Sequence, residues 1–174
     1  TLLNLGLVVS NQGRFEEAAG LFRRADPIIQ ASDNPIYRAR NFVYLGFDAA
    51  NRDKFADALR YAKSAAAMWR DLIAQKKSGI EELAGGSEAR DAMRGELAHT
   101  LNLAAAMAWR TNDVAYAEAA AKEALGIIGE EHDLPPWWGP DVLMTLGDVL
   151  AREGRLREAE ESLRGALIFN QRLF

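Results

Sequence analysis

The side chains that could carry out catalysis or hold a metal ion are few and widely separated. The chain of 174 residues has two histidines, His99 and His132, and no cysteine. Neither histidine has a second histidine or a cysteine at metal-site spacing, and without cysteine there is no thiolate nucleophile and no disulfide. His132 stands among acidic residues, where a solvated loop is favoured over a divalent-ion site. His99 falls in a helical segment, where contact with a surface or groove is favoured over catalysis.

The acidic residues also lack the arrangement of an acid and base pair. Glu16-Glu17, Glu81-Glu82 and Glu160-Glu161 are adjacent in sequence. Neighbours on a helix point in different directions, so these pairs are interpreted as solvated faces. Gly85-Gly86 lacks the strand and lysine of a phosphate-binding loop, which favours a plain turn. We therefore expect no catalytic residues, no metal site, no cofactor and no enzymatic activity.

Composition places the chain among soluble globular proteins. Hydrophobic residues make up 49% and charged residues 26%, which is enough to bury a continuous core. The net charge of −4 is mildly acidic and forms no basic stripe, so a nucleic-acid partner is not expected. No apolar run approaches about 18 residues, so no membrane association is expected. The sequence does not identify a compartment, and a cytoplasmic location is the working expectation.

One stretch, from Leu143 to Leu167, has the pattern of a helical hairpin and recurs three more times. Apolar residues repeat at helical spacing on both sides of a helix breaker, which is Gly154 in this copy. A small residue precedes each breaker, and we expect it to lie where the two helices cross closest, with Gly147 facing Ala159. The small residues are Gly6, Gly46, Ala105 and Gly147, and the breakers are Gly13, Asn51 with Asp53, Asn112 with Asp113, and Gly154.

The spacing predicts a single domain, residues 1–174, with four repeats. The repeats cover approximately residues 1–31, 36–70, 98–129 and 138–174, and residues 71–97 form a helical extension or insertion.

Three helix boundaries are also predicted. The second helix of the second repeat should run from Lys54 to Lys77, well beyond the usual length. Ser87 should cap a long helix from Glu88 to about Arg110. Pro27 should bend or end the helix that starts at Arg14, near Ala25.

The first copy resembles the tetratricopeptide repeat (TPR) family, through Leu2, Leu5-Gly6 and Val9, followed by Ala18, Phe22 and Ala25. The resemblance implies an all-α, TPR-like right-handed superhelix of about four antiparallel helical hairpins. It further implies that the first helix of each hairpin lines a concave groove that binds a peptide or partner protein. The predicted binding surface consists of residues on those first helices that do not belong to the apolar stripe used for packing. They are Asn4, Arg40, Tyr44, Phe47, Asn51, His99, Asn102, Trp109, Arg110, Asp141, Thr145, Asp148 and Arg152.

Several aromatic residues allow two interpretations. Phe47 and Trp109 are of the types that dominate binding energies, yet they can equally pack between repeats. Trp137 and Trp138 form either a second contact patch or part of the packing of the last hairpin.

The last helix continues its apolar pattern to the end of the sequence. Ile168, Phe169, Leu173 and Phe174 are apolar, whereas a terminal repeat normally presents a polar outer face. We therefore expect further helices or a second subunit to contact Phe169, Leu173 and Phe174.

A second resemblance concerns the first two copies. The run from Ser10 to Ala18 and the connector from Ser32 to Pro35 are similar to the repeat region that precedes the caspase-like CHAT peptidase domain in some proteobacterial proteins. The primary hypothesis is a non-enzymatic scaffold, part of a larger bacterial protein, that binds an extended peptide or helix. The alternative is a regulatory or recognition arm of an attached CHAT peptidase domain that this chain does not contain.

Overall fold

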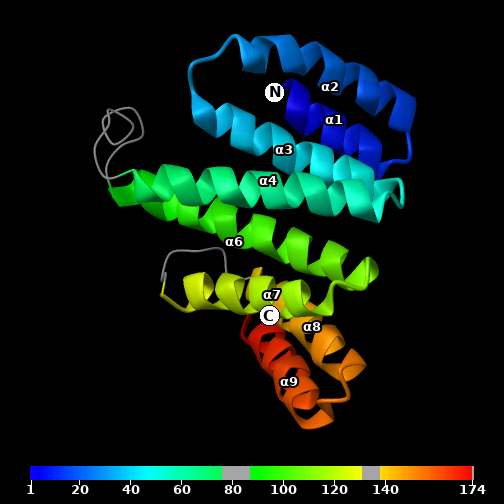
Figure 1. The fold of residues 1–174 in the computed structure, drawn as a ribbon, viewed down its shortest axis with the longest axis vertical. Helices are drawn as coiled ribbons and strands as arrows, with labels where there is room; N and C mark the ends of the chain where they lie inside the picture. The colour runs from blue at the N-terminus through cyan, green and yellow to red at the C-terminus, as the bar shows by residue number, and fades with distance from the viewer. Residues whose placement is uncertain (76–86, 131–137, 174) are drawn as a thin grey trace.

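The structure is a computed structural model that describes residues 1–75, 87–130 and 138–173 (Figure 1). Every regular element in these ranges is an α-helix, which confirms the predicted all-α fold of stacked hairpins. The helices are α1 (Leu2–Asn11), α2 (Phe15–Gln30), α3 (Pro35–Asn51), α4 (Phe55–Ala74), α6 (Ser87–Arg110), α7 (Val114–Glu130), α8 (Trp138–Arg152) and α9 (Leu156–Leu173).

The helices pair into hairpins that stack in chain order, from α1 and α2 at one end to α8 and α9 at the other (Figure 1). The first helix of each later hairpin packs against both helices of the hairpin before it: α3 on α1 and α2, α6 on α3 and α4, and α8 on α6 and α7. Within the described ranges, helices contact only those of their own or a neighbouring hairpin, as in repeat proteins generally.

The four hairpin turns share one backbone conformation. Each has a residue with positive φ at the same place: Gly13 (76°), Asp53 (57°), Asn112 (66°) and Gly154 (76°). The residue that follows donates its N–H to the carbonyl five residues back, for example Asp113 to Ala108 at 2.8 Å and Arg155 to Leu150 at 3.0 Å. This bond satisfies a carbonyl that the end of the helix would otherwise leave unpaired. The predicted breakers therefore end the first helices through the left-handed conformation that Gly, Asn and Asp tolerate best.

The small residues seven positions before these turns lie at close helix crossings. A Cβ built on Gly6 would lie 2.7 Å from Phe22 Cε1, and one on Gly147 would lie 2.7 Å from Leu163 Cγ. The carbonyl oxygen of Ala159 is 3.4 Å from the same built Cβ, so Gly147 meets both Ala159 and Leu163 rather than Ala159 alone. Ala105 is fully buried at the corresponding place in the third hairpin.

Alanine allows the second hairpin to pack closely on the third. Ala58, Ala62, Ala65 and Ala66 of α4 are fully buried, and so is Trp69 one turn later. Small side chains bring helix axes together, while the large indole fills the wider space beyond them.

Of the two alternatives predicted at Pro27, the structure excludes one, and one further boundary differs from its prediction. Helix α2 continues through Pro27, and Ala31 N donates to Pro27 O at 3.1 Å, so the helix does not end near Ala25. Ala25 and Ile29 are both buried on one face, and their packing holds the helix on both sides of the exposed proline. Helix α4 ends at Ala74, earlier than predicted.

Other boundary expectations fall near or outside the described residues. Helix α6 starts at Ser87 itself, one residue before the predicted start. Lys77, His132, Trp137 and Phe174 lie outside the described residues, and so do the side chains of Trp138 and Leu173.

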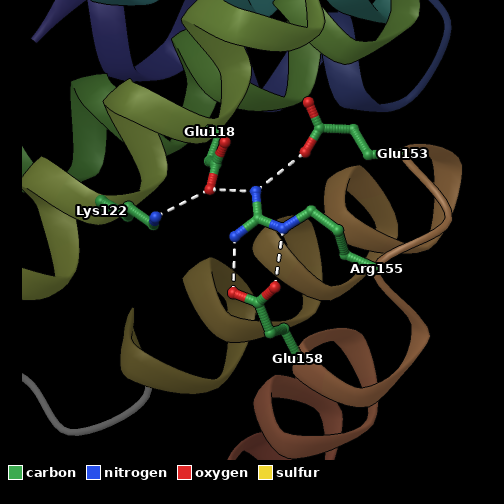
Figure 2. Close-up of polar contacts among 5 residues, drawn as sticks. All are labelled: Glu118, Lys122, Glu153, Arg155 and Glu158. Atoms are coloured by element: carbon green, nitrogen blue, oxygen red, sulfur yellow. Dashed lines mark hydrogen bonds and ion pairs between the residues drawn. The ribbon is translucent and has the colours of Figure 1, made fainter.

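Arg155, in the last turn, connects the final hairpin to α7 (Figure 2). Its guanidinium donates to both carboxylate oxygens of Glu158, at 2.7 and 2.5 Å, and to Glu153 at 3.0 Å. It also donates to Glu118 of α7 at 2.7 Å, where Lys122 makes a second ion pair of 2.7 Å. Hydrogen bonds from Lys122 and Arg155 lower the pKa of Glu118, and the hydrogen bond from Arg155 lowers the pKa of Glu158. The cluster therefore favours the ionised form of Glu118 and Glu158 where the last hairpin meets α7.

Changing Gly154 to alanine should destabilise the fold by about 1 kcal/mol, because a side chain at φ +76° is strained even though the space around it is open. The measurement is the free energy of unfolding in urea. Gly126→Ala is the matched control, since this helical glycine also has nothing within 4 Å of a built Cβ and its replacement should stabilise by about 0.5 kcal/mol. Equal effects of the two changes would contradict the assignment of strain to the turn.

Changing Arg155 to glutamine should make stability less sensitive to acid. The folded-state pKa values of Glu118 and Glu158 lie below the ordinary 4.5, so their contribution is present above pH 4.5 and is lost as pH falls through the lowered values. Free energies of unfolding measured from about pH 6 to about pH 3 should fall less steeply in the variant. Arg164→Gln, which removes an exposed pair within α9, should keep the wild-type slope.

Candidate partner-binding face

The first helices α1, α3, α6 and α8 form one continuous face of the solenoid, which we call the first-helix face. Side-chain hydrogen bonds join successive members. Tyr44 Oη on α3 donates to Asn4 Oδ1 on α1, and Asn51 Nδ2 donates to Asn11 Oδ1 at 2.8 Å. Two predicted contact residues of α3 thus hold α1 in place.

The same pattern continues toward the last hairpin. Arg40 of α3 donates from Nε to Glu96 Oε1 of α6 at 3.0 Å. Thr145 Oγ1 of α8 donates to Asn102 Oδ1 of α6 at 3.1 Å. Arg152 Nη1 of α8 donates to the carbonyl oxygen of Trp109 at 3.1 Å. These side chains therefore join neighbouring first helices to one another, and they also lie on the surface of the first-helix face.

A cavity of about 640 Å³ opens between α1, the end of α2, α3 and the first half of α6. Its walls are mainly apolar, and five of the predicted contact residues line it: Asn4, Arg40, Tyr44, Phe47 and His99. The other lining residues are Thr1, Leu2, Leu3, Leu7, Ala25, Ile28, Ile29, Ser32, Tyr37, Val43 and Glu96. We call this space the first-helix cavity.

The polar groups of the first-helix cavity gather around one ion pair. Arg40 Nη2 lies 2.9 Å from Glu96 Oε1, with 44% of the arginine side chain and 27% of the glutamate side chain exposed. Burial raises the pKa of Tyr44, and the charge of Glu96 raises it further while that of Arg40 opposes the shift. Tyr44 therefore stays a neutral phenol at physiological pH and keeps its hydrogen bond to Asn4.

His99 forms part of the cavity wall as an uncharged ring. Its ring centroid lies 5.2 Å from that of Phe47, with the planes tilted by 35°. Burial lowers the pKa of His99, although the charges of Glu96 and Asp141 oppose the shift. Across the described ranges, no three His, Asp or Glu side chains gather as a possible metal site. His99 and Phe47 therefore make an aromatic surface, and Phe47 both packs against the core and lines the cavity.

The remaining predicted contact residues lie outside the first-helix cavity. Trp109 is partly buried against the core and has the guanidinium groups of Arg110 and Arg152 at 5.4 and 5.9 Å from its ring centroid. Asp141 and Asp148 are exposed on α8. The full set outside the cavity is Asn51, Asn102, Trp109, Arg110, Asp141, Thr145, Asp148 and Arg152.

Sequence reasoning missed the residues that α2 and the following connector contribute. Ile28 is 65% exposed and Tyr37 is 49% exposed, and both line the first-helix cavity. They flank a connector that is held by hydrogen bonds, since Asn34 Oδ1 accepts from Ile36 N at 3.0 Å and Arg38 donates to Ser32 O at 3.2 Å. The sequence did offer a signal for these lining residues, because two large side chains, Ile28 and Tyr37, stand on either side of a capped turn.

A stripe of exposed apolar residues runs along α9. Leu156, Leu167 and Ile168 are 66%, 57% and 50% exposed. Phe169 is 38% exposed, and its ring lies 3.5 Å from a Cβ built on Gly139 of α8, so it packs in part within its own hairpin.

Comparison with known proteins supports the repeat family at the start of the chain. A family model described as tetratricopeptide repeat matches residues 1–25, which cover α1 and much of α2. No curated protein matches the chain. A solved structure, the crystal structure of BtubC (BKLC) from P. vanneervenii, is similar with 17% sequence identity and a TM-score of 0.47, over 97% of this chain and 78% of that one.

Within the described ranges the chain is an all-helical solenoid of stacked hairpins, and its first 25 residues match the tetratricopeptide repeat model. None of the described helices has a stretch long and apolar enough to span a bilayer.

The imidazole of His99 should titrate below the ordinary pKa of 6.5, because burial disfavours its charged form. As pH falls from 6.5 through the lowered value, the unfolded state takes up a proton before the folded state does, so stability should decrease over that window. NMR titration of the two histidine rings checks the value, with His132→Gln used to assign the signals. A pKa for His99 at or above 6.5 would contradict the buried, uncharged ring.

Proposed function

We propose that this chain is a non-enzymatic protein-interaction scaffold, part of a larger bacterial protein, that binds an extended peptide or a helix of a partner protein on its first-helix face. The observation that carries the proposal is the first-helix cavity. Its volume of about 640 Å³ lies within the usual range of about 300–1,000 Å³ for ligand pockets. It combines a large apolar lining with a few polar groups, which is the usual composition of such pockets.

The lining favours an apolar anchor from the partner. Leu3, Ile29 and Val43 are buried beneath the opening, while Ile28 and Tyr37 are exposed at it. A bulky side chain placed here would remove these exposed residues from water, a gain of roughly 25 cal/mol for each Å² of apolar surface buried. The half-exposed Arg40 and Glu96 pair at the edge then offers both a donor and an acceptor to the partner backbone.

The same residues favour binding over catalysis. A general base needs a proton-accepting group within hydrogen-bond reach of substrate, and a nucleophile needs an adjacent activating group. In the first-helix cavity the histidine ring lies tilted against Phe47, the tyrosine is held neutral, and the carboxylate of Glu96 is paired with Arg40. These groups shape and orient a bound chain.

The apolar stripe of α9 supports a second, separate contact. Its exposed leucines lie on the outer side of the last hairpin, whereas the corresponding second helices of the earlier hairpins are covered by the next first helix. Contact with further helices or a second subunit through Phe169, Leu173 and Phe174 remains a prediction.

Changing Phe47 to alanine, or Ile28 to aspartate, should reduce partner capture by at least about tenfold, because each removes apolar surface at the cavity where an anchor would sit. The measurement is a quantitative pull-down from bacterial lysate with the immobilised chain. Ile28→Asp changes a 65% exposed residue, so its loss of binding is separable from loss of folding.

Ala67→Asp is the control, because it places the same charge on an exposed apolar residue of α4 that belongs neither to the first-helix cavity nor to the α9 stripe. It should leave capture unchanged. Recovery of the same partners by wild type, Phe47→Ala and Ile28→Asp would contradict binding at the first-helix cavity.

A further inference from the structure

Within the residues that the structure describes, the exposed large apolar side chains outside the first-helix cavity gather at the two ends of the solenoid (Figure 1). At one end lie Leu5 and Val8 of α1, which are 51% and 53% exposed. Those at the other end are Met144 of α8 and Leu156, Leu163, Leu167, Ile168 and Phe169 of α9. Exposed apolar side chains gathered in this way mark an interaction surface.

Leu5 and Val8 occupy places that are buried in the later first helices. They lie one residue before and two residues after Gly6, the small residue at the helix crossing. The corresponding residues of the last two hairpins are at most 9% exposed, and they are Ala104 and Met107 of α6 and Leu146 and Val149 of α8. These two helices pack on α4 and α7, the second helices of the hairpins before them. The exposed face of α1 is therefore of the kind that packs on a preceding second helix.

Helix α9 presents the other side of such a junction. Leu163 and Leu167 lie nine and thirteen residues after Gly154, the turn residue with positive φ, and they are 42% and 57% exposed. Ala62 and Ala66 hold the corresponding places in α4, on which α6 packs, and both are fully buried. The exposed face of α9 is therefore of the kind that receives the next first helix.

The exposed leucines of α9 line an apolar groove of about 440 Å³. Its apolar lining residues are Ala151 of α8 and Leu156, Ala159, Leu163 and Leu167 of α9. We call this space the α9 groove. Both helices of the last hairpin contribute to it, just as both helices of each earlier hairpin receive the next first helix. The charged residues of the lining, Glu160 and Arg164, pair with each other at 2.7 Å.

The junction between α2 and α3 shows how the two kinds of face meet. Phe22 and Asp26 hold the places of Leu163 and Leu167 in α2, and they line one groove together with Leu45 of α3. Leu45, which holds the place of Leu5, also packs against the buried cluster that contains Phe22. A copy of α1 packed on the last hairpin in the same way would therefore lie in the α9 groove.

Helix α1 is suited to this groove because it carries no charge. Its ten residues, Leu2–Asn11, include no Asp, Glu, Lys or Arg. In the arrangement of α3 on α2, Leu5 and Val8 would meet Leu163 and Leu167, four side chains that are each about half exposed. Their contact removes apolar surface from water, and no ionised group of α1 loses its hydration.

We propose that copies of this chain associate head to tail, with α1 of one copy packed in the α9 groove of the next. The helix that fits the groove is present in the chain itself, and each copy offers one α1 face and one α9 groove. Such a contact is heterologous, so a dimer keeps one free surface of each kind and can add further copies. Association continues the first-helix face from one copy to the next. It is independent of the first-helix cavity, because neither Leu5, Val8 nor any residue of α9 lines that cavity.

The test is sedimentation velocity of the chain, whose monomer mass is 19.2 kDa. The average mass of the wild type should rise above that of a dimer between about 1 μM and about 300 μM. Val8→Asp and Leu167→Asp each place a charge on one of the two surfaces. Each variant alone should stay monomeric over this range, a loss of at least about tenfold in association constant.

An equimolar mixture of these two variants distinguishes a head-to-tail contact from a symmetric one. Val8→Asp keeps its α9 groove and Leu167→Asp keeps its α1 face, so the mixture should form a dimer and add no further copies. Both changes fall on residues that are more than half exposed, and circular dichroism checks that the variants fold. Leu156→Asp, at a residue of the same groove that is 66% exposed, replaces Leu167→Asp if that variant does not fold.

Ile28→Asp, which alters the first-helix cavity, should associate as the wild type does. Loss of peptide binding and loss of self-association are thereby separated. A wild type that remains at 19.2 kDa throughout would overturn the proposal. Undiminished association of either Val8→Asp or Leu167→Asp alone, or a mixture of the two that stays monomeric, would overturn it as well.

Discussion

The close crossing of two helices at a glycine or alanine is the constraint on which this structure depends. Where Gly6 and Gly147 sit, an added Cβ would lie 2.7 Å from a side chain of the partner helix, so only glycine permits the observed approach. A tight hairpin is too thin to bury its own apolar surface on both sides. Each hairpin must therefore receive the first helix of the next against both of its helices, and repetition of that contact produces the solenoid.

That packing rule leaves first helices with two open sides. A first helix such as α3 lies between two hairpins, and different residues of it line the first-helix cavity and a second groove beside α2 and α4. Side chains of α3 that are not used in core packing either bond to a neighbouring helix or line an open space. Arg40 does both, since it bonds Glu96 of α6 while remaining 44% exposed at the cavity.

The sequence predicted the local features well because they depend on nearby residues. Gly13 and Gly154 are recognisable as breakers from their type and spacing, and Asp53 and Asn112 adopt the same positive φ at the corresponding places. The predicted surface was less complete, because a helical projection does not show which neighbour a polar residue meets. Asn51 and Asn102 were assigned to the surface from their position, yet each bonds a side chain on an adjacent first helix. Ile28 was missed because it belongs to a second helix.

The position of the first-helix cavity follows from which side chains join the first helices there. At the cavity, Tyr44 of α3 bonds Asn4 of α1 and Arg40 of α3 bonds Glu96 of α6, and all four residues line its wall. At the other end of α3, outside the cavity, the shorter pair Asn51 and Asn11 makes the bond to α1. Long side chains that meet through their tips leave room beside their stems. The tyrosine and the arginine on α3 therefore border the open space and also supply the polar groups that a bound segment would meet.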